Sequence, residues 1–138
     1  MRAAEAVGEH SQIGSAVRKG DEICITLLDD KAIAELNGRW RGKNSPTNVL
    51  SFPAFAGPLT PIPRSLGDLA LAFETIDRES NTEGKLFEDH VAHLVVHGIL
   101  HLLGYDHLSE GEAVRMEALE TSILASIGVA DPYARAVA

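Results

Sequence analysis

The segment KLFEDHVAHLVVHGILHLLG, residues 85–104, places the strongest constraint on the fold. It is apolar nearly all round, and a helix of that kind belongs in the core of a protein rather than on its surface. A chain of 138 residues has the length of one domain. We therefore expect a single domain over residues 1–138, built around a central helix at 85–104.

Shorter segments predict strands and helices around this helix. Asp30 is expected to cap a helix that ends at Gly38, and Ser109 and Glu112 form a capping box for the last helix. Pro53 predicts that its strand ends at an edge of the sheet. The interleaving of strands and helices favours a small α/β arrangement of two or three layers. Strands are predicted at 22–30, 47–54 and 66–73, helices at 2–18, 31–37, 74–84 and 109–127, and a loop at 57–65.

Three histidines in the stretch HGILHLLGYDH have the spacing of metal ligands. His97 and His101 are one helical turn apart, so both rings can reach one ion. Gly104 suits the left-handed turn that ends a helix, after which His107 can return to the same ion. Three protein ligands leave one position open, as in catalytic zinc sites. His93 lies one turn before His97 and is expected behind the ligands, because a fourth ligand would close that position.

Zinc proteases with the pattern H-E-x-x-H-x-x-G-x-x-H share this spacing, but their glutamate takes a proton from water. Gly98 stands in its place here, so peptide hydrolysis is disfavoured. Three neutral imidazoles leave the ion its full charge, which favours an anionic substrate such as a phosphodiester. Asp68 and Asp106 are candidates to accept a ligand histidine's second N–H. Either of them, or solvent, could accept the reaction's proton, and Asp106 is equally explained as a turn residue.

The charge of the chain is unevenly distributed. The net charge is −8, yet residues 36–67 contain Arg39, Arg41, Lys43 and Arg64 and neither Asp nor Glu. This segment is therefore +4 and the remaining residues carry −12. A local basic surface can hold the phosphates of a nucleic acid on an acidic protein. A solvated loop explains the same four residues, so charge alone does not decide between the two interpretations.

Other sequence features indicate the cellular setting. A single cysteine, Cys24, excludes an internal disulfide and is typical of a reducing compartment. Its apolar surroundings predict a buried side chain. No apolar run approaches the roughly 20 residues of a membrane helix, and the first residues do not have the pattern of a signal peptide. We expect a cytoplasmic protein, with His10 and His90 on its surface.

Three blocks together strongly resemble the YbeY family of bacterial single-strand-specific metallo-endoribonucleases. They are HGILHLLGYDH, LNGRWRGKNSPTNVLSFP at 36–53 and LGDLALA at 66–72, and the resemblance extends over about residues 22–127. It implies an α+β fold with a small mixed sheet of three to four strands, about five helices and a zincin-like central histidine helix. It also implies action in 16S rRNA 3′-end maturation and ribosome quality control. The strand that usually precedes the first helix in this family has no counterpart here.

The resemblance further implies roles for individual residues. One zinc ion per chain is expected on the three motif histidines, and the functionally important arginine maps onto Arg41. Imidazole also suits nickel and copper, so the choice of zinc rests on the resemblance. The expected partners are single-stranded rRNA and the small ribosomal subunit or its assembly factors. Arg41 is expected to grip the scissile phosphate, and the remaining RNA contacts are predicted at Arg39, Lys43, Asn48 and Ser51.

Several alternatives stay open at this level. Trp40 could stack on a base or be a half-buried packing residue, and Asn48 and Ser51 could simply face solvent. The nucleophile is either metal-activated water or the RNA 2′-hydroxyl. A zincin-type metalloprotease without the usual glutamate and a non-catalytic, zinc-bound ribosome assembly factor are the rival functions.

Overall fold

The computed structural model describes residues 2–54 and 59–134. Helices and strands alternate irregularly along this part of the chain, and a short 3-10 turn, η1, follows the first helix. In chain order the elements are α1 (Arg2–Glu9), η1 (Gly14–Ala16), β1 (Glu22–Leu28), α2 (Asp30–Arg41), β2 (Val49–Pro53), β3 (Ser65–Ala72), α3 (Phe73–Glu83), α4 (Phe87–Leu102) and α5 (Glu110–Ala125).

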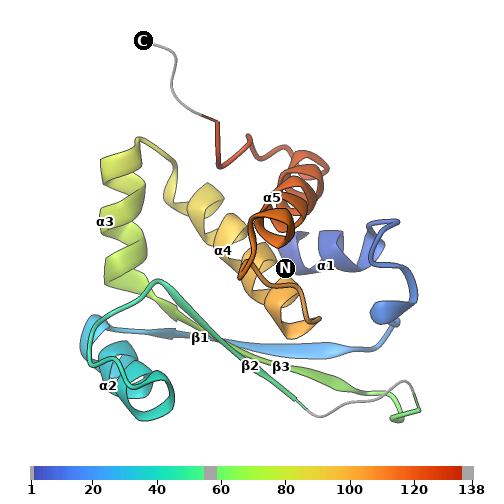
Figure 1. Cartoon of the computed structure of the whole chain (residues 1–138), viewed down its shortest axis with the longest axis horizontal. Helices are drawn as coiled ribbons and strands as arrows, with labels where there is room; N and C mark the ends of the chain where they lie inside the picture. The colour runs from blue at the N-terminus through green and yellow to red at the C-terminus, as the bar shows by residue number, and fades with distance from the viewer. Residues whose placement is uncertain (1, 55–58, 135–138) are drawn as a thin grey trace.

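The three strands form one mixed sheet in the order β1-β3-β2. β1 runs parallel to β3, and β2 runs antiparallel to it, so β2 is an edge strand as Pro53 predicted. Helix α2 lies on one face of the sheet, and α1, α3, α4 and α5 lie on the other side (Figure 1). The predicted α+β class, with its small mixed sheet and about five helices, is confirmed.

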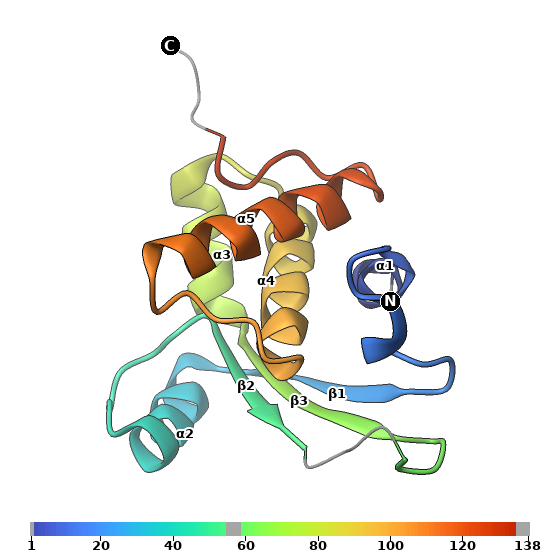
Figure 2. The same cartoon turned by 45° about the vertical axis from the view of Figure 1, so that its right-hand side comes forward.

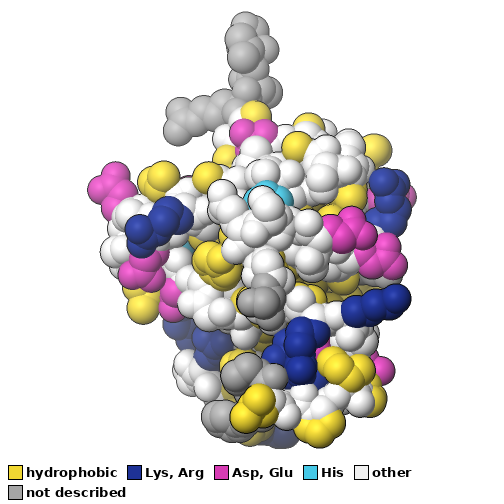
Figure 3. All heavy atoms as spheres, turned by 90° about the vertical axis from the view of Figure 1, so that its right-hand side faces the viewer, with side chains coloured by type: hydrophobic (Ala, Val, Ile, Leu, Met, Phe, Trp, Pro, Cys, Tyr) yellow, Lys and Arg dark blue, Asp and Glu magenta, His cyan; other side chains and the backbone are white. Residues whose placement is uncertain are grey.

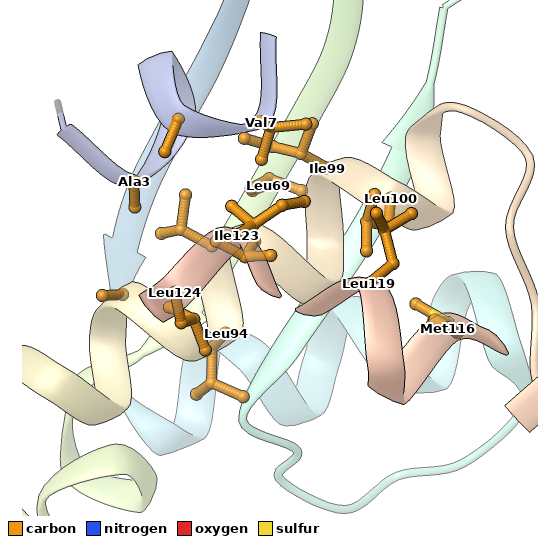
Figure 4. Packing of buried hydrophobic residues seen from close by; sticks show 14 of the residues in the cluster. Ala3, Val7, Leu69, Leu94, Ile99, Leu100, Met116, Leu119, Ile123 and Leu124 are labelled. Carbon is orange, nitrogen blue, oxygen red and sulfur yellow. The ribbon is translucent and has the colours of Figure 1, made fainter. Parts of the chain in front are cut away.

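The main core lies between the sheet and the helices above it, with α4 at its centre. Side chains of α1, α4 and α5 meet there, together with Leu69 of β3 (Figure 4). Eight residues of α4 are buried, which confirms the core position that its apolar sequence predicted. A smaller cluster lies between α2 and the opposite face of the sheet and is formed by Ile33, Leu50, Ala70 and Ala72. The alternation of β3 residues between these clusters fixes which strand residues can reach α4.

Three local predictions are corrected by the structure. Asp29 caps α2, because its carboxylate accepts the Ala32 amide at 2.7 Å, and the helix continues through Gly38 to end at Gly42. Gly38 lies inside the helix, and the absence of a β-carbon there leaves room for the side chain of Asn44. Cys24 is exposed rather than buried, since it lies on the partly covered face of β1.

His90 is also placed differently from the prediction of a surface residue. It is 5% exposed, and its Nε2 lies 2.9 Å from Glu79 Oε1, which joins α4 to α3. The same carboxylate accepts from the amide of Asn48 at 3.1 Å. His10 does lie at the surface, where its ring bonds Ser122 at 2.9 Å.

Arg64 does not contribute to an RNA-binding surface, although it was counted in the basic segment. Its side chain is 6% exposed and pairs with Asp21, which is 1% exposed, at 2.5 Å. The guanidinium also donates to the carbonyl of Ala16 at 3.1 Å.

Figure 3 shows the face at the end of the sheet where β1 begins, with Lys and Arg side chains gathered in its lower half. None of the described helices combines the length and the apolar composition needed to span a bilayer.

Candidate metal centre and adjoining cavity

The last turns of α4 and the loop that follows bring three histidines together. His97 and His101 have their Nε2 atoms 3.0 Å apart. Gly104 adopts the predicted left-handed conformation with φ 98°, and the amide after it donates to the carbonyl of Leu100 at 3.0 Å. The chain thereby turns back, and the ring of His107 lies 5.6 Å from that of His97 and 5.0 Å from that of His101, between centroids. Figure 2 shows this loop running from the end of α4 towards α5.

The geometry of this trio fits a metal ion. One ligand atom from each histidine lies within 4.8 Å of the others. A tetrahedral ion with bonds of about 2.0–2.1 Å holds its ligand nitrogens about 3.3 Å apart, close to the His97–His101 separation. Burial, together with the neighbouring His97 and His107, lowers the pKa of His101 below its ordinary value. His101 is therefore neutral at pH 7, the form in which an imidazole can bind a metal.

A buried carboxylate stands behind the histidines. Glu120 of α5 is 0% exposed, and its Oε1 lies 2.5 Å from His97 Nδ1. Its Oε2 lies 3.1 Å from His93 Nε2 and also accepts from the hydroxyl of Tyr133. An ionised carboxylate only accepts hydrogen bonds, so both ring nitrogens must donate to it. In a neutral His97 ring the lone pair is then on Nε2, which points at His101, the arrangement that a metal ligand requires.

Glu120 is held in its charged form. Burial alone would raise the pKa of Glu120, but hydrogen bonds from His93, His97 and Tyr133 outweigh it and lower the pKa to about 2. Burial and the bond to Glu120 raise the pKa of Tyr133 above its ordinary value, so the phenol stays a donor. His93, His97 and Glu120 also lie close enough to form a metal-binding group. In that group the ring nitrogens of His93 and His97 that face Glu120 donate their protons to it, so they have no lone pair to offer a metal, whereas His97 presents its other nitrogen to His101 and His107.

The three histidines open onto a cavity of about 750 Å³ that is bounded on its other side by α2 and β2. Arg41, the last residue of α2, reaches into this cavity, and its guanidinium donates to the carbonyl of Ser51 at 3.4 Å. Arg41 forms no ion pair with any residue that the structure describes. The cavity therefore combines a histidine trio with an exposed, uncompensated guanidinium.

Most of the predicted site residues line this cavity. Lys43 is exposed at its rim, and Ser51 and Asn48 line its wall. Neither of the latter two simply faces solvent: the hydroxyl of Ser51 donates to the carbonyl of Gly98 at 3.2 Å, and Asn48 bonds α3 through Glu79. Arg39 is exposed on α2 but does not line the cavity.

The two aspartates predicted beside the histidines lie in different places. Asp106 lines the cavity, and its Oδ1 accepts the backbone amide of His107 at 2.8 Å, so it acts as a turn residue within the site. Asp68 lies on β3 in register with Cys24 and Phe52, on the face of the sheet opposite α4. The structure does not bring Asp68 to the histidines, and the carboxylate that bonds His97 is Glu120 instead.

Comparison with known proteins identifies the family of this chain. A sequence model of the family described as Endoribonuclease YbeY matches residues 1–128. The chain belongs to the YbeY endoribonuclease family. An Endoribonuclease YbeY from Methylocella silvestris is 54% identical over 123 residues, 89% of this chain and 69% of that protein. One from Bradyrhizobium sp. is 53% identical over 138 residues, 97% of this chain and 78% of that protein.

A solved structure supports the fold. The solution structure of TM1509 from Thermotoga maritima superimposes with a TM-score of 0.51 at 23% identity, covering 97% of this chain and 85% of that one. At that identity the likeness concerns the arrangement of the elements alone.

Gly98 explains why this YbeY-family chain lacks the protease glutamate. A β-carbon at position 98 would lie 2.7 Å from Leu69 Cδ2 and 3.3 Å from Ser51 Oγ. Helix α4 thus packs closely against the sheet here, and a larger residue at this position would have to displace the Leu69 side chain. The position is structural, and the side chain it would carry points at the sheet rather than into the cavity.

Gly98→Ala is expected to destabilise the protein by about 1–3 kcal/mol, because the added methyl group overpacks the contact with Leu69. Chemical denaturation measures this change. Gly111→Ala is the matched control: it is a helical glycine with open space around its β-carbon position, so it should stabilise by up to about 1 kcal/mol. The Gly98→Ala/Leu69→Ala double variant should lose less stability than the sum of the losses in the two single variants, and strict additivity would contradict the clash.

Glu120 was missed by the sequence analysis, although the sequence contains a signal for it. Helix α5 buries Met116, Leu119, Ile123 and Leu124 at helical spacing, and Glu120 lies on the same stripe. A carboxylate in an apolar stripe is rarely buried without partners. Tyr133 follows α5 and has no comparable pattern, because only the folded chain brings it back to Glu120.

Proposed function

We propose that this chain is a zinc-dependent, single-strand-specific endoribonuclease that acts in 16S rRNA 3′-end maturation and ribosome quality control. The observation that carries the proposal is the cavity that joins His97, His101 and His107 to the uncompensated guanidinium of Arg41. Family membership supports RNA as the substrate. The metal and the ribosomal setting rest on the three-histidine geometry and the resemblance of the motifs.

The residues have distinct roles in this proposal. His97, His101 and His107 would hold the zinc ion, and Glu120 keeps His97 in the tautomer that presents Nε2. When bound, zinc acts as a Lewis acid that stabilises negative charge on phosphate oxygens and lowers the pKa of water. Arg41 binds the scissile phosphate and offsets the charge that grows on it. Lys43 at the rim holds a neighbouring phosphate.

The proton leaving the nucleophile needs an acceptor within the cavity. Asp106 is the one carboxylate among the described residues that line it. Its Oδ1 is occupied by the amide of His107, which leaves Oδ2 to accept a proton. Glu120 does not suit this task, because His93, His97 and Tyr133 already donate to it.

Cleavage of a labelled single-stranded RNA by purified protein tests the proposal. We expect cleavage that stops with a chelator and returns with zinc, and little cleavage of a duplex of the same sequence. A peptide substrate incubated in parallel should stay intact. Zinc-loaded, folded protein that binds the RNA and leaves it uncut would overturn the nuclease and favour a non-catalytic assembly factor.

Glu120→Gln is expected to lower zinc affinity roughly 10–100-fold, the usual cost of losing a carboxylate behind a ligand histidine. The amide keeps the shape of the carboxylate but removes its charge. Its NH₂ group would also face the ring N–H of either His93 or His97, so two donors would meet with no acceptor between them. Titration with zinc against a competing chelator measures the change. Glu5→Gln, an exposed carboxylate on α1 that lines neither the cavity nor the pocket behind the histidines, is the control and should leave the affinity unchanged. Equal affinities for Glu120→Gln and the unaltered chain would contradict the role.

A further inference from the structure

A second, largely apolar groove lies on the face of the sheet that carries α2. Its volume is about 610 Å³, and it is formed where α2 covers only part of the three strands. Trp40 stands at its rim and Asp68 in its wall. The other lining residues include Phe52, Leu36 and Cys24. The groove is separate from the histidine cavity, because Asp68 and Ala70 of β3 lie on the face of the sheet opposite α4.

Trp40 presents an aromatic surface to solvent at this groove. Its side chain is 64% exposed, and its ring meets that of Phe52 edge-on, with centroids 6.2 Å apart and planes at 68°. Most of the indole surface therefore stays open to solvent beside this contact. Packing within the chain therefore does not account for most of the surface of Trp40, and of the two interpretations left open by the sequence the half-buried packing residue does not match this exposure.

The groove and the histidine cavity adjoin each other across α2 and β2. On α2, Trp40 lines the groove and the next residue, Arg41, lines the cavity. On β2, Phe52 lines the groove and the preceding residue, Ser51, lines the cavity. Successive residues of β2 point to opposite faces of the sheet and β2 is an edge strand, so a strand of RNA whose phosphate is held by Arg41 would pass over this edge to bring a neighbouring nucleotide beside Trp40.

The charges in and around the groove favour a nucleobase over a phosphate as the group that binds inside it. Arg39, Arg41 and Lys43 are exposed on or just after the last turn of α2, next to Trp40. Inside the groove the one charged side chain among the described lining residues is Asp68. A carboxylate repels a phosphate but accepts the N–H groups of a nucleobase. The cations suit the backbone of the strand, and the groove suits an unstacked base.

We propose that this groove is a base-binding subsite, in which Trp40 stacks on a nucleobase of the single-stranded RNA whose adjacent phosphate is held at Arg41. The proposal rests on the proposed function and deepens it, because it explains selection of single strands. A base inside a duplex is paired and stacked, and cannot enter the groove. Asp68 then serves as an acceptor for the base rather than as a partner of the histidines.

Trp40 fluorescence tests this subsite directly, because Trp40 is the only tryptophan in the chain. The measurement uses the full chain with His101→Ala to prevent cleavage, after its fold is verified by circular dichroism. One probe is a labelled single-stranded RNA, and the other is an abasic oligonucleotide with the same number of phosphates. Emission of Trp40 reports stacking, and anisotropy of the label reports affinity.

We expect the RNA to quench Trp40 and the abasic oligonucleotide to leave its emission unchanged. Trp40→Ala should weaken RNA binding roughly 5- to 150-fold, the range of one base–aromatic stack, with a smaller loss for Trp40→Phe. Arg41→Ala should weaken binding of both probes. Val114→Ala removes a similarly exposed apolar side chain on α5 and should change neither.

The outcomes separate this proposal from the proposed function. RNA that binds without quenching, and equally well to Trp40→Ala, would overturn the subsite and leave the nuclease standing. A chain that binds neither RNA nor the abasic oligonucleotide would overturn the proposed function itself. Trp40 emission that changes with protein concentration in the absence of RNA would assign the groove to a second copy of the chain, and would also overturn the subsite.

Discussion

Arg41→Ala is expected to slow RNA cleavage by about 10²–10³-fold at saturating substrate, the usual effect of removing one group that stabilises transition-state charge. Arg41 lies in the cavity opposite the histidines and forms no ion pair with the described residues. No protein carboxylate therefore competes with the phosphate for its guanidinium. Single-turnover cleavage of labelled RNA measures the rate without a contribution from product release.

Two matched variants separate this role from general attraction of RNA. Arg39→Ala removes an equal charge two residues away on a side chain that does not line the cavity. It should weaken binding at low salt and leave the cleavage rate of bound RNA within a few-fold. Arg41→Lys keeps the charge but loses the paired N–H donors, so it should recover only part of the rate. Equal losses for Arg39→Ala and Arg41→Ala would mean that Arg41 contributes charge alone.

The elements of this fold that could be predicted from sequence are those fixed by local chemistry. The apolar run of α4 predicted a buried helix, and Gly104 predicted the turn that returns the chain to the histidines. Both depend on neighbours within a few residues. Gly38 shows where such logic fails: glycine often ends a helix, but here it makes room for Asn44 and the helix continues.

The remaining features depend on contacts between distant segments. Arg64 looks like a surface cation until Asp21, which lies 43 residues away in the chain, is packed against it. Asp68 has the right chemistry for the histidine site but lies on the wrong face of β3, and only the register of the sheet reveals this. Glu120, which lies on another helix, accepts the hydrogen bond from His97 Nδ1. A partner that folding brings in from a distant segment leaves no spacing pattern, so the ligands are easier to predict than the residues that orient them.

His101→Ala is expected to abolish zinc loading and to reduce cleavage on the order of 10³-fold or more, because the Lewis acid supplies several kcal/mol of charge stabilisation. The protein should nevertheless stay folded. Helix α4 is held by apolar residues such as Val95, Val96 and Leu100, none of which needs the ion. Zinc content after dialysis, thermal melting and RNA cleavage measured on one preparation test all three statements.

His10→Ala provides the matched control, since it removes an imidazole that bonds only Ser122 and the neighbouring Gln12 amide at the surface. It should keep both zinc and activity. If His101→Ala or chelation instead melts the fold, the ion is structural, because binding energy that holds a fold together is lost with the ligand. A structural ion would favour the zinc-bound assembly factor over the nuclease. A folded His101→Ala chain that loses both zinc and cleavage would show that the zinc is catalytic, in keeping with the coordination position that three histidine ligands leave open.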